Sequence, residues 1–259
     1  PAVRGTAGGF GLGAMTVGIG QINLTVGMAL ASLAPAGAVS ALGYADRLTQ
    51  LPVGIVGLAL GMALLPRLAG WGADGDAAGF AAELRRGVLA ALGLGLPAAV
   101  GLALLADPIV HALFVRGAFT ESDAALTAAV VAALAPGVPA AVLVKALAAG
   151  CFARSDLKTP CYAALACGGA NLLAGLMLAG PWGAPGVALA ASIAAYVNLG
   201  WLAAAAGVDG RAALRGLGAP CAVIVAATAG MGWTVRRLAD IVAAVAGGLA
   251  SLLATGVTA

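Results

Sequence analysis

SALGYADRLTQLPVGIVGLALGMALLPRL, residues 40–68, decides the fold class of this chain. Between Arg47 and Arg67 the run has no charged residue, and most of its side chains are aliphatic or glycine. About 20 such residues in a helix cross the hydrocarbon core of a bilayer, which is roughly 30 Å thick. The run therefore predicts a transmembrane helix near residues 38–66.

The composition of the whole chain suits a bilayer rather than water. Only 9% of the 259 residues are charged, 62% are hydrophobic, and the mean hydropathy is +1.06. Soluble globular domains carry about 25% charged residues, so this chain has too few charges to cover itself in water. We predict an all-α integral membrane protein in which alanine and glycine let the helices pack closely.

Uncharged runs elsewhere bring the predicted number of transmembrane helices to about eight. Two runs are too long for one helix and are divided by turn residues, Pro35 and Gly37 in the first and GPWGAPG at 180–186 in the second. Segment 107–119 is short and amphipathic, which predicts a helix at the membrane interface. The predicted spans are 8–31, 38–66, 84–106, 124–150, 159–179, 186–207, 217–235 and 240–258.

The basic residues orient this predicted bundle. If the N-terminus lies in the cytoplasm, the basic residues divide eight to three between the cytoplasmic and outer sides, which satisfies the positive-inside rule. The cytoplasmic eight are Arg4, Arg67, Arg85, Arg86, Arg154, Lys158, Arg211 and Arg215, and the outer three are Arg116, Arg236 and Arg237.

Arg47 is the most informative residue for function. It lies inside a predicted span, where a charged side chain costs about 2.5–3.5 kcal/mol even on the lenient insertion scale. One interpretation is an anion-binding residue in a cavity, since a guanidinium grips phosphate oxygens in pairs. The other is a structural ion pair with Asp46, although adjacent helical residues point about 100° apart.

Three other residues inside the predicted spans have two interpretations each. Lys145 lies late in the fourth span and either faces the same cavity or extends toward the cytoplasmic surface. Asn23, in the first span, is a candidate for substrate binding, although interhelical hydrogen bonding is the default for such an amide. Pro52 predicts a kink that is either static or part of a moving helix.

Enzyme chemistry finds no support in the pattern. The four cysteines form no CxxC pair, and the single histidine, His111, has no catalytic or metal-binding partner in the sequence. The net charge of +3 is too small to indicate nucleic acid as a partner. We therefore expect no enzyme active site and no metal, with membrane lipids as the surroundings of the chain. A transporter without a cofactor, apart from an unidentified coupling ion, is what the family resemblance described next implies.

Four motifs resemble the MurJ (MviN) family of lipid II flippases. They are GQINLTV at 20–26, the 40–68 stretch quoted above, DPIVHALFVRGAF at 107–119 and LVKALAAGCFARSDLKTP at 143–160. They occur in the family's order and spacing, and ADRL followed by the Leu-Pro kink is the most specific of them. The resemblance covers nearly the whole chain and weakens after about residue 208.

The resemblance implies a fourteen-helix fold of the multidrug/oligosaccharidyl-lipid/polysaccharide exporter superfamily. Our eight spans correspond to helices 7–14, and the chain begins at Pro1 rather than Met, so we expect it to be a piece of a longer protein. Residues 1–208 would be the C-terminal six-helix lobe. Residues 209–259 would be a terminal helix pair, which in the family forms a groove for the lipid tail. The N-terminal lobe would be the missing partner.

The resemblance also implies the activity, which is translocation of lipid II between leaflets of the bacterial inner membrane. Lipid II is an undecaprenyl-pyrophosphate-linked disaccharide-pentapeptide, and the family is expected to move it from the cytoplasmic to the periplasmic side by alternating access. Arg47 matches the family's cavity arginine, and with Asp46, Lys145 and Asn23 it makes up the predicted substrate site.

Two departures from the family leave the coupling ion undecided. Gly27 stands where the family often has Asp, and the fifth span has Asn171 but no carboxylate of the kind that binds sodium in some members. Two other functions are alternatives to a lipid II flippase: a related exporter of drugs or polysaccharide precursors, and a non-transporting membrane scaffold in which Arg47 is paired and dispensable.

Overall fold

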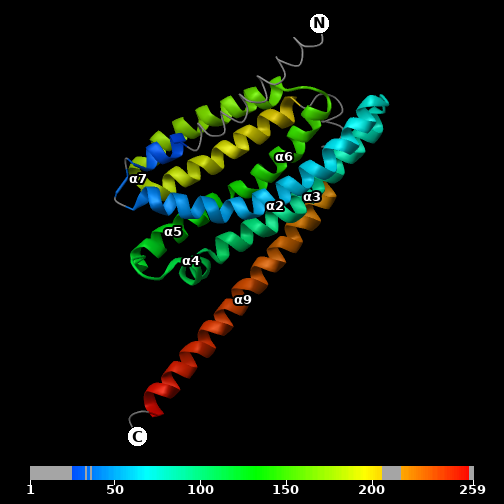
Figure 1. The fold of residues 1–259 in the computed structure, drawn as a ribbon. Helices are drawn as coiled ribbons and strands as arrows, with labels where there is room; N and C mark the ends of the chain where they lie inside the picture. The colour runs from blue at the N-terminus through cyan, green and yellow to red at the C-terminus, as the bar shows by residue number, and fades with distance from the viewer. Residues whose placement is uncertain (1–24, 33, 36, 206–216, 257–259) are drawn as a thin grey trace.

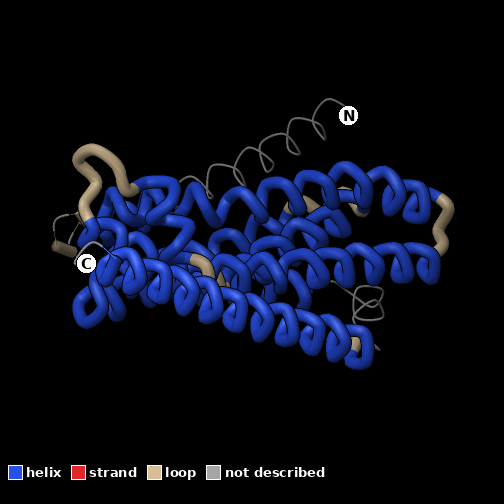
Figure 2. The backbone as a smooth tube through the Cα atoms, turned by 90° about the horizontal axis from the view of Figure 1, so that it is seen from below, coloured by secondary structure: helices blue, strands red, loops and turns tan. Residues whose placement is uncertain are grey.

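The computed structural model describes residues 25–32, 34–35, 37–205 and 217–256, with side chains as far as residue 239. All regular structure in these residues is helical (Figure 2), which confirms the predicted all-α class. A short helical stretch at 25–31 comes first. The helices that follow are α2 (Ala38–Ala73), α3 (Ala77–Leu104), α4 (Ala106–Phe114), α5 (Glu121–Leu134), α6 (Gly137–Ala153), α7 (Lys158–Ala205) and α9 (Gly218–Gly256).

Four of the described helices are long and apolar enough to cross a membrane, and a fifth span results if α5 and α6 are counted as one. The longest, α7, carries two of the predicted spans, because its backbone breaks at Gly183 with φ 58° and ψ −137°. That glycine lies inside the predicted break at 180–186, and its positive φ is one that other residues rarely adopt. Only residues 25–31 of the predicted first span are described.

Helix α6 lies at the centre of the bundle. It packs against α2, α3 and α7, while α5 packs between α2 and α7 (Figure 1). Small residues make this close packing feasible: Ala140, Ala146 and Gly150 of α6 are all buried. α2 runs on through Pro52 and Pro66, and α9 lies along α3.

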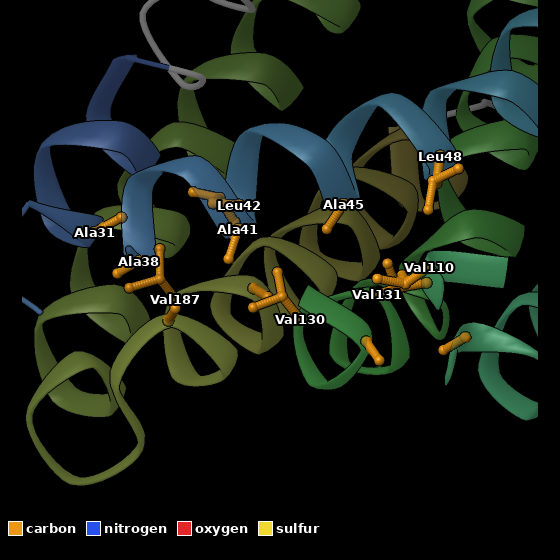
Figure 3. Close-up of a cluster of buried hydrophobic side chains, with 14 of the residues drawn as sticks. Ala31, Ala38, Ala41, Leu42, Ala45, Leu48, Val110, Val130, Val131 and Val187 are labelled. Carbon is orange, nitrogen blue, oxygen red and sulfur yellow. The ribbon is translucent and has the colours of Figure 1, made fainter. Parts of the chain in front are cut away.

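Two apolar clusters form the interior. Figure 3 shows the first, where Ala41, Ala45 and Leu48 of α2 meet Val130 of α5 and Val187 of α7. The second cluster joins the later part of α2 to α3 and α6, through residues such as Leu64 and Leu68. The clusters lie toward opposite ends of α2, so one helix ties both halves of the bundle together.

The predicted span 124–150 is not one straight helix, which corrects the sequence prediction. It consists of α5 and α6, bent by 44° at the Ala135–Pro136 junction. The physical reason is Pro136, which cannot donate a backbone hydrogen bond to the turn before it.

Helix α7 supplies the hydrogen bonds that this bend leaves unmade. The Ser192 hydroxyl contacts the Ala133 carbonyl at 2.8 Å and the Leu134 carbonyl at 3.2 Å, and the Tyr196 hydroxyl donates to the Pro136 carbonyl at 2.9 Å. The helices approach so closely that a Cβ on Gly137 would lie 2.9 Å from the Ser192 Cα. A broken helix survives in a bilayer only where neighbouring helices satisfy its backbone in this way.

The predicted pair of terminal helices also needs correction. In place of spans 217–235 and 240–258, the structure has one continuous helix, α9, of 39 residues. The sequence around Arg236, Arg237 and Asp240 contains no glycine or proline, and its residues other than Asp240 are good helix formers, so charge alone does not end the helix. At about 1.5 Å per residue α9 is about 58 Å long, roughly twice the hydrocarbon thickness, and its C-terminal half leads away from the bundle (Figure 1).

The two ends of the bundle can be told apart by their contacts. At one end the α2–α3 and α6–α7 turns meet, where the Arg154 guanidinium lies 4.0 Å from the centroid of the Phe80 ring. At the other end Gly37, just before α2, lies beside Asp123 in the first turn of α5. This grouping agrees with the predicted alternation, in which the first end is cytoplasmic and the second is outside.

We predict that the two ends label from opposite sides of the membrane. In a cysteine-free background of the full-length protein, Asp74→Cys should resist a membrane-impermeant maleimide added to intact spheroplasts, and Ser122→Cys should react with it. Both positions are exposed in the structure. The reverse pattern would show that the positive-inside assignment is wrong.

We also predict that Ser192→Ala weakens the bundle, because the Ala133 and Leu134 carbonyls lose the one hydroxyl proton that they share. The free energy of unfolding should fall by about 1–2 kcal/mol, measured by denaturant titration of the full-length protein in detergent. The control is Ser32→Ala, because that hydroxyl donates to Ala29 within its own turn. Equal stability of the two variants would contradict this account of the bend.

Candidate functional site

Arg47 projects from an exposed face of α2, about 14 Å from the start of the helix. Ser40, Gly43, Gln50 and Gly54 are spaced three or four residues apart on either side of it, so all five share one face. We call these five residues the α2 stripe. Each is exposed or half-buried, and each is small or polar.

The α2 stripe differs from the surfaces that face lipid. On α7 the outward residues are large and apolar: Leu173 is 66% exposed and Met177 is 77% exposed. On α2 itself, Leu51 borders the stripe four residues after Arg47, and Leu51, Ile55 and Met62 are similarly exposed and apolar. The stripe is therefore a polar seam on an otherwise lipid-compatible helix, which is typical of a cavity wall or of a contact with another helix.

Asp46 does not neutralise Arg47. Its carboxylate is half-buried and is hydrogen-bonded to the side chain of Gln50, one turn further along α2. Among the described residues no carboxylate lies within ion-pair distance of the Arg47 guanidinium. The structural ion pair that the sequence left open is absent from this part of the chain.

Lys145 lies on the side of α6 that faces α2. It is exposed, and its Cγ would lie 3.1 Å from a Cβ added to Gly57, so its alkyl stem crosses that glycine. Gly57 is about 15 Å along α2 from Arg47 and within a quarter turn of it. The structure thus puts Arg47, Asp46 and Lys145 on one side of the bundle without direct contact. Asn23 lies outside the described residues.

Two other cations of the bundle are paired with a carboxylate. Arg67 and Arg86 both bind Glu83, at 3.1 and 3.0 Å, and the Glu83 side chain is only 7% exposed. This triad joins α2 to α3 toward the end of the bundle where the α2–α3 turn lies. Such pairing is the usual way to keep charges at a protein–lipid boundary, and it sets Arg47 and Lys145 apart.

The motif at 107–119 lies at the end of the bundle where α2 begins. His111 of α4 lies 3.5 Å from Asp107 and 3.2 Å from Glu121. Phe114 and Phe119 pack on Tyr44 of α2, with ring centroids 4.8 and 5.5 Å from the tyrosine ring. The motif therefore fixes the α4–α5 loop against the first turns of α2.

The motif at 143–160 contains a turn with a structural role. Ser155 has φ 58°, and the Asp156 carboxylate accepts hydrogen bonds at 3.1 Å from the backbone N–H groups of Lys158 and Thr159, which begin α7. Partial burial raises the pKa of Asp156, but these bonds and the Thr159 hydroxyl outweigh it and hold that pKa below its ordinary value. The turn explains the motif without a ligand.

Sequence reasoning missed most of the α2 stripe. It selected Arg47 for its charge and passed over Ser40, Gly43, Gln50 and Gly54, although their three-and-four spacing in an apolar helix was visible in the sequence. The contact of Lys145 with Gly57 depends on the packing of two helices and had no signal in the sequence.

The family profile described as "Lipid II flippase MurJ" matches residues 2–254 of the chain. The chain belongs to the MurJ family. Curated MurJ relatives agree: a protein named probable lipid II flippase MurJ from Rhizobium tropici is 42% identical over 186 residues, which cover 71% of this chain and 34% of that protein. The MurJ relative from Vibrio cholerae is 35% identical over 186 residues, covering 72% of this chain and 35% of its own length.

Solved structures give the same fold. A lipid II flippase MurJ in an inward closed conformation matches with a TM-score of 0.76 and 25% identity, over 86% of this chain and 46% of that one. A MOP superfamily transporter from Pyrococcus furiosus matches with a TM-score of 0.64 at 15% identity, over 75% of this chain and 42% of its own. This MurJ chain spans about a third of the length of the curated relatives and is a multi-pass membrane protein by family and by its apolar helices.

We predict that Asp156 of this MurJ chain is needed for stability and not for ligand binding. Asp156→Ala should lower the free energy of unfolding by about 1 kcal/mol, the usual cost of a lost cap, and leave lipid affinity unchanged. Because the folded pKa is depressed, the contribution is present at neutral pH and is lost as the pH falls through that pKa. Asp74→Ala, at an exposed turn position, is the control; a loss of affinity without a loss of stability in Asp156→Ala would contradict this role.

Proposed function

We propose that this chain is the C-terminal part of a lipid II flippase of the bacterial inner membrane. It would move undecaprenyl-pyrophosphate-linked peptidoglycan precursor from the cytoplasmic to the periplasmic leaflet, without making or breaking bonds. The support is membership of the MurJ family together with the α2 stripe, where a guanidinium lies in a span without an ion-pair partner among the described residues.

Arg47 is the residue that we propose binds the pyrophosphate. A pyrophosphate offers several anionic oxygens, and the planar guanidinium fork can bind two of them at once. The neighbouring Gly43 and Gly54 have no side chain, and a Cβ at either would meet no atom within 4 Å, so the surface beside Arg47 has room for a bulky headgroup. Lys145 would add a second cation about 15 Å deeper along α2.

Alternating access is the mechanism that suits this arrangement. The α2 stripe needs a second wall to become a cavity, and we propose that the N-terminal lobe of the same protein supplies it. One lobe would rock against the other around the site, as in transporters built from repeats. The lipid tail would stay in the bilayer.

We predict that Arg47→Ala abolishes flipping in the full-length protein. Without the guanidinium the pyrophosphate loses two charge-assisted hydrogen bonds, and Arg47→Lys, which keeps the charge but not the fork, should be impaired less. The measurement is translocation of fluorescent lipid II in proteoliposomes, with protein level and melting temperature as checks. Arg237→Ala, whose guanidinium lies over the Trp233 ring of α9, is the matched control and should flip normally.

The double variant Asp46→Leu/Arg47→Leu separates this proposal from the scaffold alternative. If Arg47 only balanced Asp46, removing both charges would restore function. The pyrophosphate role requires that the double variant stay inactive, so rescue by it, or normal flipping by Arg47→Ala, would refute that role.

A further inference from the structure

A pocket of about 540 Å³ opens at the end of the bundle where α2 begins, next to the start of the α2 stripe. Its walls come from the first turns of α2, the α4–α5 loop and the first turns of α5. This volume is within the range of about 300–1,000 Å³ that is usual for small-molecule sites. Most of its lining residues belong to the motifs at 40–68 and 107–119, and it shares Ser40 with the α2 stripe, but Arg47 itself does not line it.

The lining combines aromatic rings with hydroxyl groups. Tyr44, Phe114 and Phe119 form the aromatic side, and Ser40 and Thr127 add hydroxyls to that of Tyr44. A hydroxyl both donates and accepts hydrogen bonds. Such a wall suits a ligand that carries hydroxyl or amide groups on a compact, partly apolar frame.

The charges of the lining are opposite in sign. Arg116 donates to the Ala112 carbonyl at 3.3 Å, and the Asp123 carboxylate accepts from the Thr120 hydroxyl at 2.6 Å and the Thr120 N–H at 3.0 Å. An anion in the pocket would be attracted by the guanidinium but repelled by the carboxylate, and a cation would be attracted by the carboxylate but repelled by the guanidinium. The lining therefore favours an uncharged group over a phosphate.

Thr127 is an independent sign of a polar ligand. Its side chain is completely buried, it lines the pocket, and its hydroxyl has no hydrogen-bond partner among the described residues. A buried polar group without a partner is costly. Thr49 and Thr228, also buried, both donate to carbonyls of their own helices.

We propose that this pocket binds the sugar part of the substrate headgroup while Arg47 holds the pyrophosphate, an inference that rests on the proposed function. Tyr44 and Ser40 precede Arg47 by one and two turns on the same side of α2, about 4.5 and 10 Å along its axis. A sugar attached to the pyrophosphate thus reaches the pocket, and its hydroxyls provide the partner that Thr127 lacks. The pocket selects substrates that carry a sugar.

The test compares two lipids: lipid II, and undecaprenyl pyrophosphate without sugar or peptide. Affinities are measured for the full-length protein in nanodiscs. Thr127→Val and Tyr44→Phe, which keep the shape of each side chain, should each weaken lipid II binding about fivefold, the loss expected for one hydrogen bond. Neither should change the affinity for undecaprenyl pyrophosphate. Thr228→Val on α9 is the matched control and should change neither.

The outcomes separate the two proposals. Equal losses for both lipids, or no loss for either in both variants, would overturn the sugar subsite. If Arg47→Ala binds both lipids normally, the pyrophosphate role fails, yet a sugar-dependent loss in Thr127→Val still supports the pocket. Melting temperatures show whether a variant is folded; Thr127→Val should not melt earlier, because its hydroxyl makes no hydrogen bond to lose.

Discussion

Backbone hydrogen bonding in a solvent that offers no partners is the constraint on which this structure depends. A continuous helix satisfies its own N–H and C=O groups, so apolar spans are helical. The difficulty is concentrated where a span breaks, and the bend between α5 and α6 is the central case. Ser192 and Tyr196 of α7 hydrogen-bond to the carbonyls around it, and Gly137 lets α7 come close enough to do so. The bend thus fixes how α5, α6 and α7 pack.

The same reasoning applied to side-chain charges identifies the site. Arg67 and Arg86 are paired with the buried Glu83 near one end of the bundle, where their cost in the membrane is met within the protein. Arg47 has no ion pair in the described part of the chain, and it lies on a seam of small and polar residues. An unpaired guanidinium at this depth is stable only if it faces water, an anion or a second protein surface. In our account Arg47 faces water, the pyrophosphate and the N-terminal lobe at different stages of transport.

Sequence and structure agree where single helices carry the information. The apolar runs predicted α2, α3 and the two halves of α7, and the turn residues at 180–186 placed the break that contains Gly183. They disagree where the outcome depends on neighbours. The bend at Pro136 could not be predicted from the local sequence. The residue that hydrogen-bonds to the carbonyls there, Ser192, lies some 56 residues later. The charges at 236–240 suggested a turn, yet nothing in the backbone there prevents a helix.

In the candidate site, too, features of a single helix could be predicted and features that depend on neighbouring segments could not. Arg47 could be selected from the sequence because a charged residue inside an apolar run is visible without knowledge of its neighbours. The outer pocket could not, because it assembles Ser40 and Tyr44 from α2 with Arg116 and Thr127 from later segments. The most direct test of the central claim is a thermodynamic cycle of four affinities in the full-length protein. The wild type and Arg47→Ala are each measured with undecaprenyl pyrophosphate and with undecaprenol, which lacks the pyrophosphate. We predict a coupling energy of about 2 kcal/mol or more between Arg47 and the pyrophosphate. A coupling energy near zero would contradict the account.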